Sequence, residues 1–151
     1  MLIADRATLR HTFAGLVKPE LEGPGKPCNL VSDGQIADWG TRSPVMVITE
    51  AGTEWIQLTT KGQYIPAAHY LAVHVFVLYA TTDGSITEAE SEDQLAPIQI
   101  GLFEVISSHR SHQVGVDWIW KSIIPDGRST IEPLKLKGLE FRHEVILLRF
   151  S

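Results

Sequence analysis

Histidines are the residues whose spacing comes nearest to a metal site, in the pairs His69 with His74 and His109 with His112. Positions five apart on a strand point to opposite faces of a sheet, so His69 and His74 are not expected to hold one metal ion. His109 and His112 lie three apart at the end of an expected helix and could share a face, but no third ligand is evident. A histidine there is also favourable for its charge alone. The sequence predicts no metal site.

Other residue types that support catalysis lack the neighbours they need. Cys28 is the only cysteine, which excludes an internal disulfide, and no histidine is near it in sequence to activate the thiol. Neither a Gly-x-Ser-x-Gly elbow nor a glycine-rich phosphate-binding motif occurs. We therefore expect no enzyme and no cofactor.

Carboxylates gather in one stretch of the chain. Residues 82–104 carry six acidic and no basic side chains, and this stretch accounts for the net charge of −5. The cluster lacks the glycine-centred loop of common calcium sites, which favours a solvated acidic face or a contact surface. The chain also has no cluster of Lys and Arg, so sequence-independent nucleic-acid binding is not expected. The candidate residues are Glu88, Glu90, Glu92 and Asp93.

Tryptophans are the remaining candidates for a contact surface. Trp118 and Trp120 alternate along one expected strand and share a face, where large aromatic residues form either core or interface. The core is the preferred interpretation for this pair. Trp39 lies beside Arg42 in a stretch without periodicity, so no local sheet face is expected to bury it, and it is the better contact candidate.

Length and composition indicate one globular domain. The chain has 151 residues, of which 44% are apolar and 21% charged, close to average soluble usage. The longest nearly apolar run, residues 67–80, is too short for a membrane helix and contains two histidines. The N-terminus lacks the pattern of a secretory signal.

Hydrophobic periodicity predicts the helices and strands of the chain. Residues 4–18 carry an apolar helical stripe that Pro19 is expected to end, and Pro97 is expected in the first turn of a second helix. The last strand is amphipathic where Arg142 and Glu144 lie and apolar on both faces later, as if it began at an exposed edge. The expected order is a helix over 4–18, a loop over 19–43, a hairpin over 44–59 with its turn at 50–53, a strand over 67–80, a helix over 94–109, a strand from 116 and a strand over 139–150. This order predicts an α+β fold with a mainly antiparallel sheet and two helices packed against it.

This order of elements resembles that of the tail terminator, or tail completion, proteins of long-tailed bacteriophages. The matching stretches are 5–18, 44–59, 67–80, 94–109 and 116–150, with a long early loop and an acidic connection between them. The resemblance implies a structural virion protein made in the bacterial cytoplasm. It would form a ring of six subunits at the head-proximal end of the tail tube, stop polymerisation of the tube and join it to the head connector.

A ring needs surfaces that meet a neighbouring subunit. The expected pieces are the 19–43 loop with Trp39 and Arg42, the Trp118–Trp120 strand, the acidic segment 83–93, and the half-polar strand with Arg142 and Glu144. The four carboxylates either meet basic groups of the next subunit or line the lumen, where negative charge would reduce adhesion of passing DNA. Two alternatives remain: another neck or tail component, such as a connector or tube-like protein, and a small-molecule enzyme with His69 or His74 beside a carboxylate in a pocket.

Overall fold

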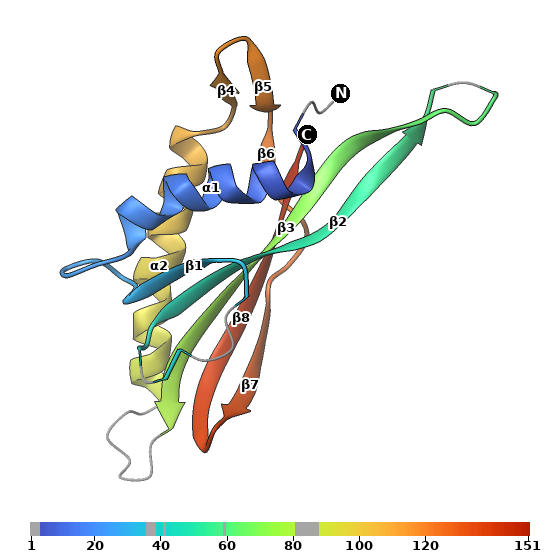
Figure 1. Cartoon of the computed structure of the whole chain (residues 1–151). Helices are drawn as coiled ribbons and strands as arrows, with labels where there is room; N and C mark the ends of the chain where they lie inside the picture. Colours follow the sequence, from blue (N-terminus) through green and yellow to red (C-terminus); the bar gives the residue numbers. More distant parts are fainter. Residues whose placement is uncertain (1–3, 36–38, 41, 59, 81–87) are drawn as a thin grey trace.

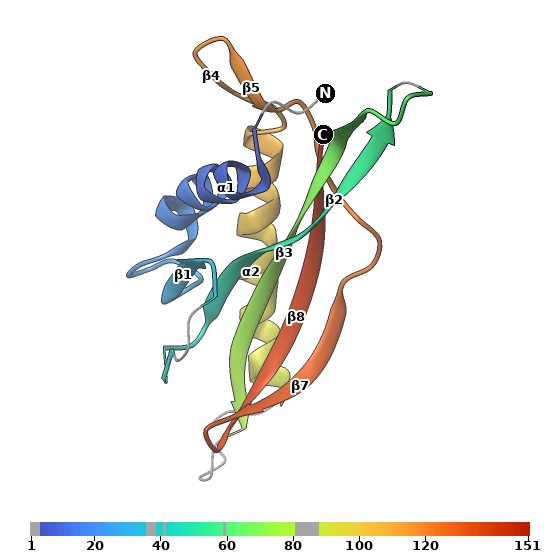
Figure 2. The same ribbon diagram turned by 45° about the vertical axis from the view of Figure 1, so that its right-hand side comes forward.

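A mixed, mostly antiparallel sheet with two helices on one face forms the body of the protein (Figures 1 and 2). The computed structural model describes residues 4–35, 39–40, 42–58, 60–80 and 88–151. The elements are α1 (Arg6–Leu21), β1 (Leu30–Asp33), β2 (Val45–Gln57), β3 (Tyr64–Ala80), α2 (Glu88–Ser108), β4 (His112–Val114), β5 (Asp117–Trp120), β6 (Ile123–Pro125), β7 (Thr130–Leu136) and β8 (Leu139–Phe150).

The main sheet has the strand order β1-β2-β3-β8-β6, and β7 also pairs with β8. Only the short edge strand β1 runs parallel to its neighbour, while the other pairs in this sheet are antiparallel. Strands β4 and β5 form a separate hairpin. The predicted α+β class, with two helices against a mainly antiparallel sheet, is confirmed.

The larger core lies between the helices and the sheet. Phe13 of α1 contacts Trp120 and Phe150 edge-on, with ring centroids 6.3 and 5.2 Å away. The two helices approach closely at Gly101, where an added Cβ would lie 2.3 Å from a methyl carbon of Leu21. Buried apolar residues of β2, β3 and β8 complete this core. Burial of this kind is the main source of the free energy of folding.

The helix-free face of the sheet carries a second, smaller core. Trp39 packs on Phe76 and Phe141, with ring centroids 4.4 and 5.6 Å away. Val45 and Val47 of β2 complete the buried part of this cluster. A single segment with one large aromatic residue therefore covers part of a sheet face that no helix covers.

Two expectations for the first half of the chain were wrong. Helix α1 does not end before Pro19 but continues to Leu21, which is buried against α2, and the 19–43 stretch contains strand β1. The hairpin over 44–59 is instead one strand, β2. Gly52 adopts a φ of 130° between two register shifts, so the residues expected to turn form a bulge that bends the strand without reversing it.

Two further expectations concern the second half. Helix α2 begins at Glu88 rather than near residue 94, so Pro97 lies in its interior rather than in its first turn. Pro97 is exposed, which leaves the carbonyl that loses its partner on the solvent side of the helix. Strand β8 does not begin at an edge, because β7, which sequence analysis missed, pairs with its first half.

Candidate subunit interface

The β2–β3 hairpin extends beyond the body of the protein (Figures 1 and 2). Strand β8 ends opposite His69, so the part of the hairpin past this residue pairs with no third strand among the described residues. We call this part, residues 54–58 and 60–68, the arm. A two-stranded ribbon is only marginally stable by itself in water. Contact with a partner would therefore stabilise the arm.

Apolar side chains cover both faces of the arm. Trp55 pairs with Pro66 and Gln57 with Tyr64, which places Trp55 and Tyr64 on one face, and Ile56 lies on the other. Trp55 and Tyr64 are each 58% exposed, and Ile56 and Leu58 are also exposed. Single exposed apolar residues are ordinary, but a group at the end of a projecting hairpin marks an interaction site.

The root of the arm is held to the start of α1 by a chain of hydrogen bonds. Arg6 donates from Nη1 to Thr53 Oγ1 over 2.8 Å, and this hydroxyl lies 2.9 Å from His69 Nδ1. His69 Nε2 lies 3.0 Å from the carbonyl oxygen of Ala4. A carbonyl can only accept, so the His69 ring donates from Nε2 to Ala4. The buried His69 is therefore a structural residue of the arm root.

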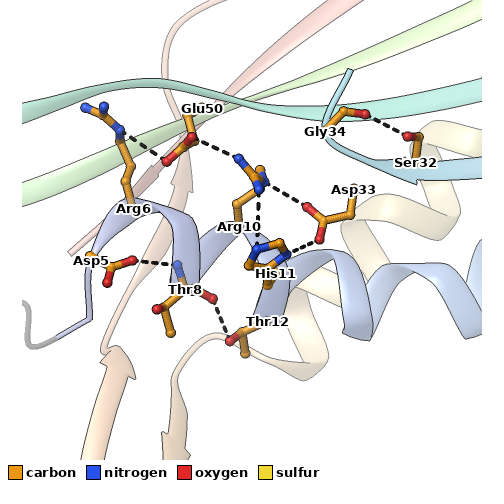
Figure 3. A network of polar contacts seen from close by, with 10 residues as sticks. All are labelled: Asp5, Arg6, Thr8, Arg10, His11, Thr12, Ser32, Asp33, Gly34 and Glu50. Carbon is orange, nitrogen blue, oxygen red and sulfur yellow. Dashed lines mark hydrogen bonds and ion pairs between the residues drawn. The ribbon is translucent and has the colours of Figure 1, made fainter. Parts of the chain in front are cut away.

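Charged residues continue this network toward β1 (Figure 3). Arg10 bridges Asp33 of β1 and Glu50 of β2, with N–O distances of 2.8 and 2.9 Å, and His11 also contacts Asp33. Partial burial raises the pKa of Asp33, but the bonds from His11 and Arg10 outweigh this effect and hold the pKa below its ordinary value. The network fixes α1 to β2 at the point where β2 leaves the body.

A cavity of about 310 Å³ opens on the helix-free face of the sheet. His74 Nδ1 lies 2.9 Å from His143 Nε2 in its wall, and His74 Nε2 lies 3.1 Å from Thr49 Oγ1. Burial lowers the pKa of both histidines, which keeps the pair neutral near pH 7. The cavity is lined by Gln35, Trp39, Val47, His74, Phe76, Leu134, Leu136 and His143, a set without a carboxylate or a nucleophile.

The predicted contact residue Trp39 is buried, which corrects the expectation that no sheet face would cover it. It lies on the helix-free face and is only 6% exposed. Arg42 is exposed and donates from Nε to the carbonyl oxygen of Trp39 over 3.1 Å. Trp39 therefore forms part of the cavity wall rather than a free contact surface.

Arg142 and Glu144 also lie elsewhere than expected, because they face α2 rather than an exposed edge. Arg142 forms an ion pair of 2.6 Å with Glu92. Glu144, 1% exposed, accepts hydrogen bonds from Gln99 Nε2 at 2.7 Å and from Ser129 Oγ at 2.9 Å. The two polar residues of β8 hold the sheet to the helix.

The four clustered carboxylates lie in the first turns of α2 rather than in a loop. Glu92 forms an ion pair with Arg142 of the same chain. Glu90 and Asp93 are exposed, while the side chain of Glu88 and residues 81–87 lie outside the described part. Their acidic side chains near the N-terminus of α2 are favourable for its dipole.

Trp120 is fully buried, as the preferred core interpretation predicted. Its Nε1 donates to the carbonyl oxygen of His109 over 2.9 Å, and His112 stacks on its ring at 5.0 Å. Trp118 is half-buried, with the Lys121 ammonium 5.9 Å from the centre of its ring. His109 and His112 therefore pack around a core residue. Within the described residues, no group of three or more His, Cys, Asp or Glu is arranged to hold a metal ion.

Sequence reasoning missed the arm and the His74–His143 pair. The apolar residues Trp55, Ile56, Leu58 and Tyr64 flank a polar turn, and this pattern could have indicated an exposed hairpin end. His143 could not be placed beside His74 without the register of β3 on β8, since they lie 69 residues apart.

No protein-family model matches this chain, and no curated protein is similar to it. No helix in the described ranges combines the length and apolar character needed to cross a membrane.

Proposed function

We propose that this chain is the subunit of a ring, of six copies, that ends the tail tube of a long-tailed bacteriophage and joins it to the head connector. The observation that carries the proposal is the arm: a projecting two-stranded ribbon with apolar residues on both faces. Such a ribbon buries little within its own chain, so its apolar surface is best explained by contact with another subunit.

The order of elements supports the same assignment. The N-terminal helix, the long strand β3, the second helix and the closing strand β8 follow one another as in the tail terminator arrangement. The hairpin expected over 44–59 is instead the single strand β2, and β1, β4, β6 and β7 add to that arrangement. Closed rings form through heterologous contacts, in which two different surfaces of one chain meet. The arm provides one such surface, and the sheet edges and the helix-free face provide others.

The exposed carboxylates at the start of α2 are assigned to the lumen of the ring. Glu90 and Asp93 are exposed, and the Arg142 guanidinium pairs with Glu92 behind them. Negative charge along a lumen would reduce adhesion of DNA passing through it. If charge-neutralising substitutions at Glu88, Glu90, Glu92 and Asp93 left assembly and DNA passage unchanged, the lumen assignment would be rejected.

The test of the ring is the native mass of the protein, alone and after addition of the tail-tube protein of the same phage. We expect ring-sized particles in at least one condition, and electron microscopy should show them at the head-proximal end of tubes. Rings on the connector instead would indicate another neck component. A monomer under both conditions would overturn the terminator proposal.

The cavity with His74 and His143 is the observation that bears on the enzyme alternative. Two neutral imidazoles could transfer a proton, but among the described lining residues there is no nucleophile, and the Glu132 carboxylate opposite His143 is exposed on β7 rather than in the cavity wall. The mixture of aromatic and aliphatic walls is typical of a binding surface.

A further inference from the structure

The arm and the cavity are two surfaces that the chain cannot bring together within one molecule. Val47 in the cavity wall and Gln57 in the arm belong to the same continuous strand, ten residues apart. At the rise of an extended strand, this separation is roughly 30 Å. Any contact between arm and cavity therefore joins two copies.

We propose that the arm of one copy docks on the helix-free face of a second copy and places the Trp55–Tyr64 face of the arm over the His74–His143 cavity. This inference rests on the proposed ring and names its subunit contact. Because the two surfaces differ, the contact is heterologous, and its repetition produces a closed ring when the rotation between copies allows closure.

Size and chemistry fit this occupant. The cavity of about 310 Å³ is large enough for an aromatic side chain, and its walls present Phe76 and Trp39 together with aliphatic residues. Trp55 and Tyr64 are the two large aromatic side chains on one face of the arm, and both are largely exposed in the single chain. Rigid aromatic anchors in a pocket are the usual centre of a protein interface.

Charge favours the same pairing. Lys61, at the tip of the arm, is exposed and forms no ion pair with the described residues. Glu132 is exposed on β7, directly opposite His143 of the cavity wall, and its charge raises the pKa of this histidine. Glu132 also forms no ion pair within the described part of the chain. A docked arm would bring the positive charge of Lys61 close to the negative charge of Glu132 at the rim of the cavity.

The first test exchanges these two charges. Lys61→Glu and Glu132→Lys should each weaken assembly about tenfold, measured as the protein concentration at half-assembly, and the double variant should recover most of the loss. All three variants change exposed side chains, so folding should be unaffected, and Lys121→Glu serves as the control for a lost positive charge. Single variants that assemble like the wild type, or a double variant without recovery, would overturn the docking.

The second test places cysteines on the two surfaces. Gln57→Cys with Gln35→Cys should form disulfide-linked chains upon mild oxidation, visible as a ladder in denaturing gels, because Gln57 lies beside Tyr64 on the same face of the arm and its replacement keeps both aromatic anchors. Native Cys28 should stay unreactive, because burial raises its pKa to about 12. Gln57→Cys with Val116→Cys is the matched control, since Val116 is 86% exposed on the β4–β5 hairpin.

The outcomes separate this inference from the proposed function. Rings without the Gln57–Gln35 cross-link would overturn the docking and leave the ring intact. Cross-linked chains that never close into rings, alone or with tail-tube protein, would support the docking and overturn the terminator role. A ladder that grows equally with the Val116 control would also overturn the docking, because it would show unspecific collision.

Discussion

His74 and His143 share a hydrogen bond of 2.9 Å across strands β3 and β8, with their rings stacked at a centroid distance of 5.2 Å. One imidazole must donate and the other accept, so the bond requires at least one neutral ring. The pair lies on a sheet face that no helix covers, and it lines the proposed docking cavity. Its protonation state therefore affects both the fold and the surface.

Acidification should destabilise the protein through this pair. Burial lowers the pKa of both rings, and the neighbouring His74 lowers that of His143 further, although Glu132 acts in the opposite direction. Well above pH 6.5, the ordinary pKa of histidine, both rings are neutral in the folded and unfolded states. As the pH falls below 6.5, the unfolded chain binds protons that the folded chain resists, at about 1.4 kcal/mol for each unit by which a pKa is lowered.

Urea denaturation at pH 7.5 and 5.5 measures this effect. His143→Gln removes one titrating ring and should reduce the loss of unfolding free energy between the two pH values. His112→Gln, at the β4–β5 hairpin, is the control for loss of a histidine elsewhere. An equal pH dependence in the wild type and His143→Gln would contradict the prediction.

Gly101 and Leu21 should show energetic coupling. A Cβ at Gly101 would lie 2.3 Å from Leu21 Cδ2, and Leu21 is buried, so Gly101→Ala should lower the free energy of unfolding by about 1–3 kcal/mol despite the higher helix propensity of alanine. Leu21→Ala should cost about 2–5 kcal/mol. The double variant should lose less than the sum, because the shortened side chain makes room for the new methyl group. Simple additivity in chemical denaturation would show that the helices adjust by moving apart.

The core of this fold could be predicted from sequence more readily than its candidate site. The dense apolar run identified β3 as a central strand, and the alternation identified β8 as a strand but placed its start at an edge, since period-2 patterns reveal a strand and not its neighbours. An additional chain reversal was predicted at 50–53, because a bulge at Gly52 and the actual turn near Gly62 have similar local residues. Only tertiary pairing distinguishes them.

The site depended on contacts between distant residues, which composition does not reveal. Trp39 was expected at the surface because its neighbours show no period, yet it is buried on the helix-free face, in contact with Phe76 of a strand far along the chain. Arg142 and Glu144 were expected at an edge, but β7 extends the sheet there and α2 supplies Glu92 and Gln99 as their partners. The arm was missed because the hairpin was predicted within residues 44–59, whereas its two strands are β2 and β3.

Glu144 should be costly to truncate. Glu144→Ala removes the acceptor of both Gln99 and Ser129 from a buried position, and we expect the free energy of unfolding to fall by about 2–4 kcal/mol. Adding Gln99→Leu should restore part of the loss, because one donor no longer lacks a partner. Thermal and urea denaturation provide the measurement, and Glu104→Ala on the exposed side of α2 is the control. An effect under 0.5 kcal/mol for Glu144→Ala would indicate that water replaces both bonds.

Shortening the aromatic residues of the arm should affect assembly and spare the fold. Trp55→Ala and Tyr64→Ala remove side chains that are each 58% exposed, so each free energy of unfolding should change by less than about 0.5 kcal/mol. If these rings are the anchors of a subunit contact, each variant should raise the concentration at half-assembly at least tenfold, as at interface hot spots. Val116→Ala removes an even more exposed apolar side chain from the β4–β5 hairpin and should leave assembly unchanged. Sedimentation at several protein concentrations distinguishes the arm variants from the Val116→Ala control. An assembly defect of equal size in all three variants would mean that exposed apolar residues in general, rather than those of the arm, hold the subunits together.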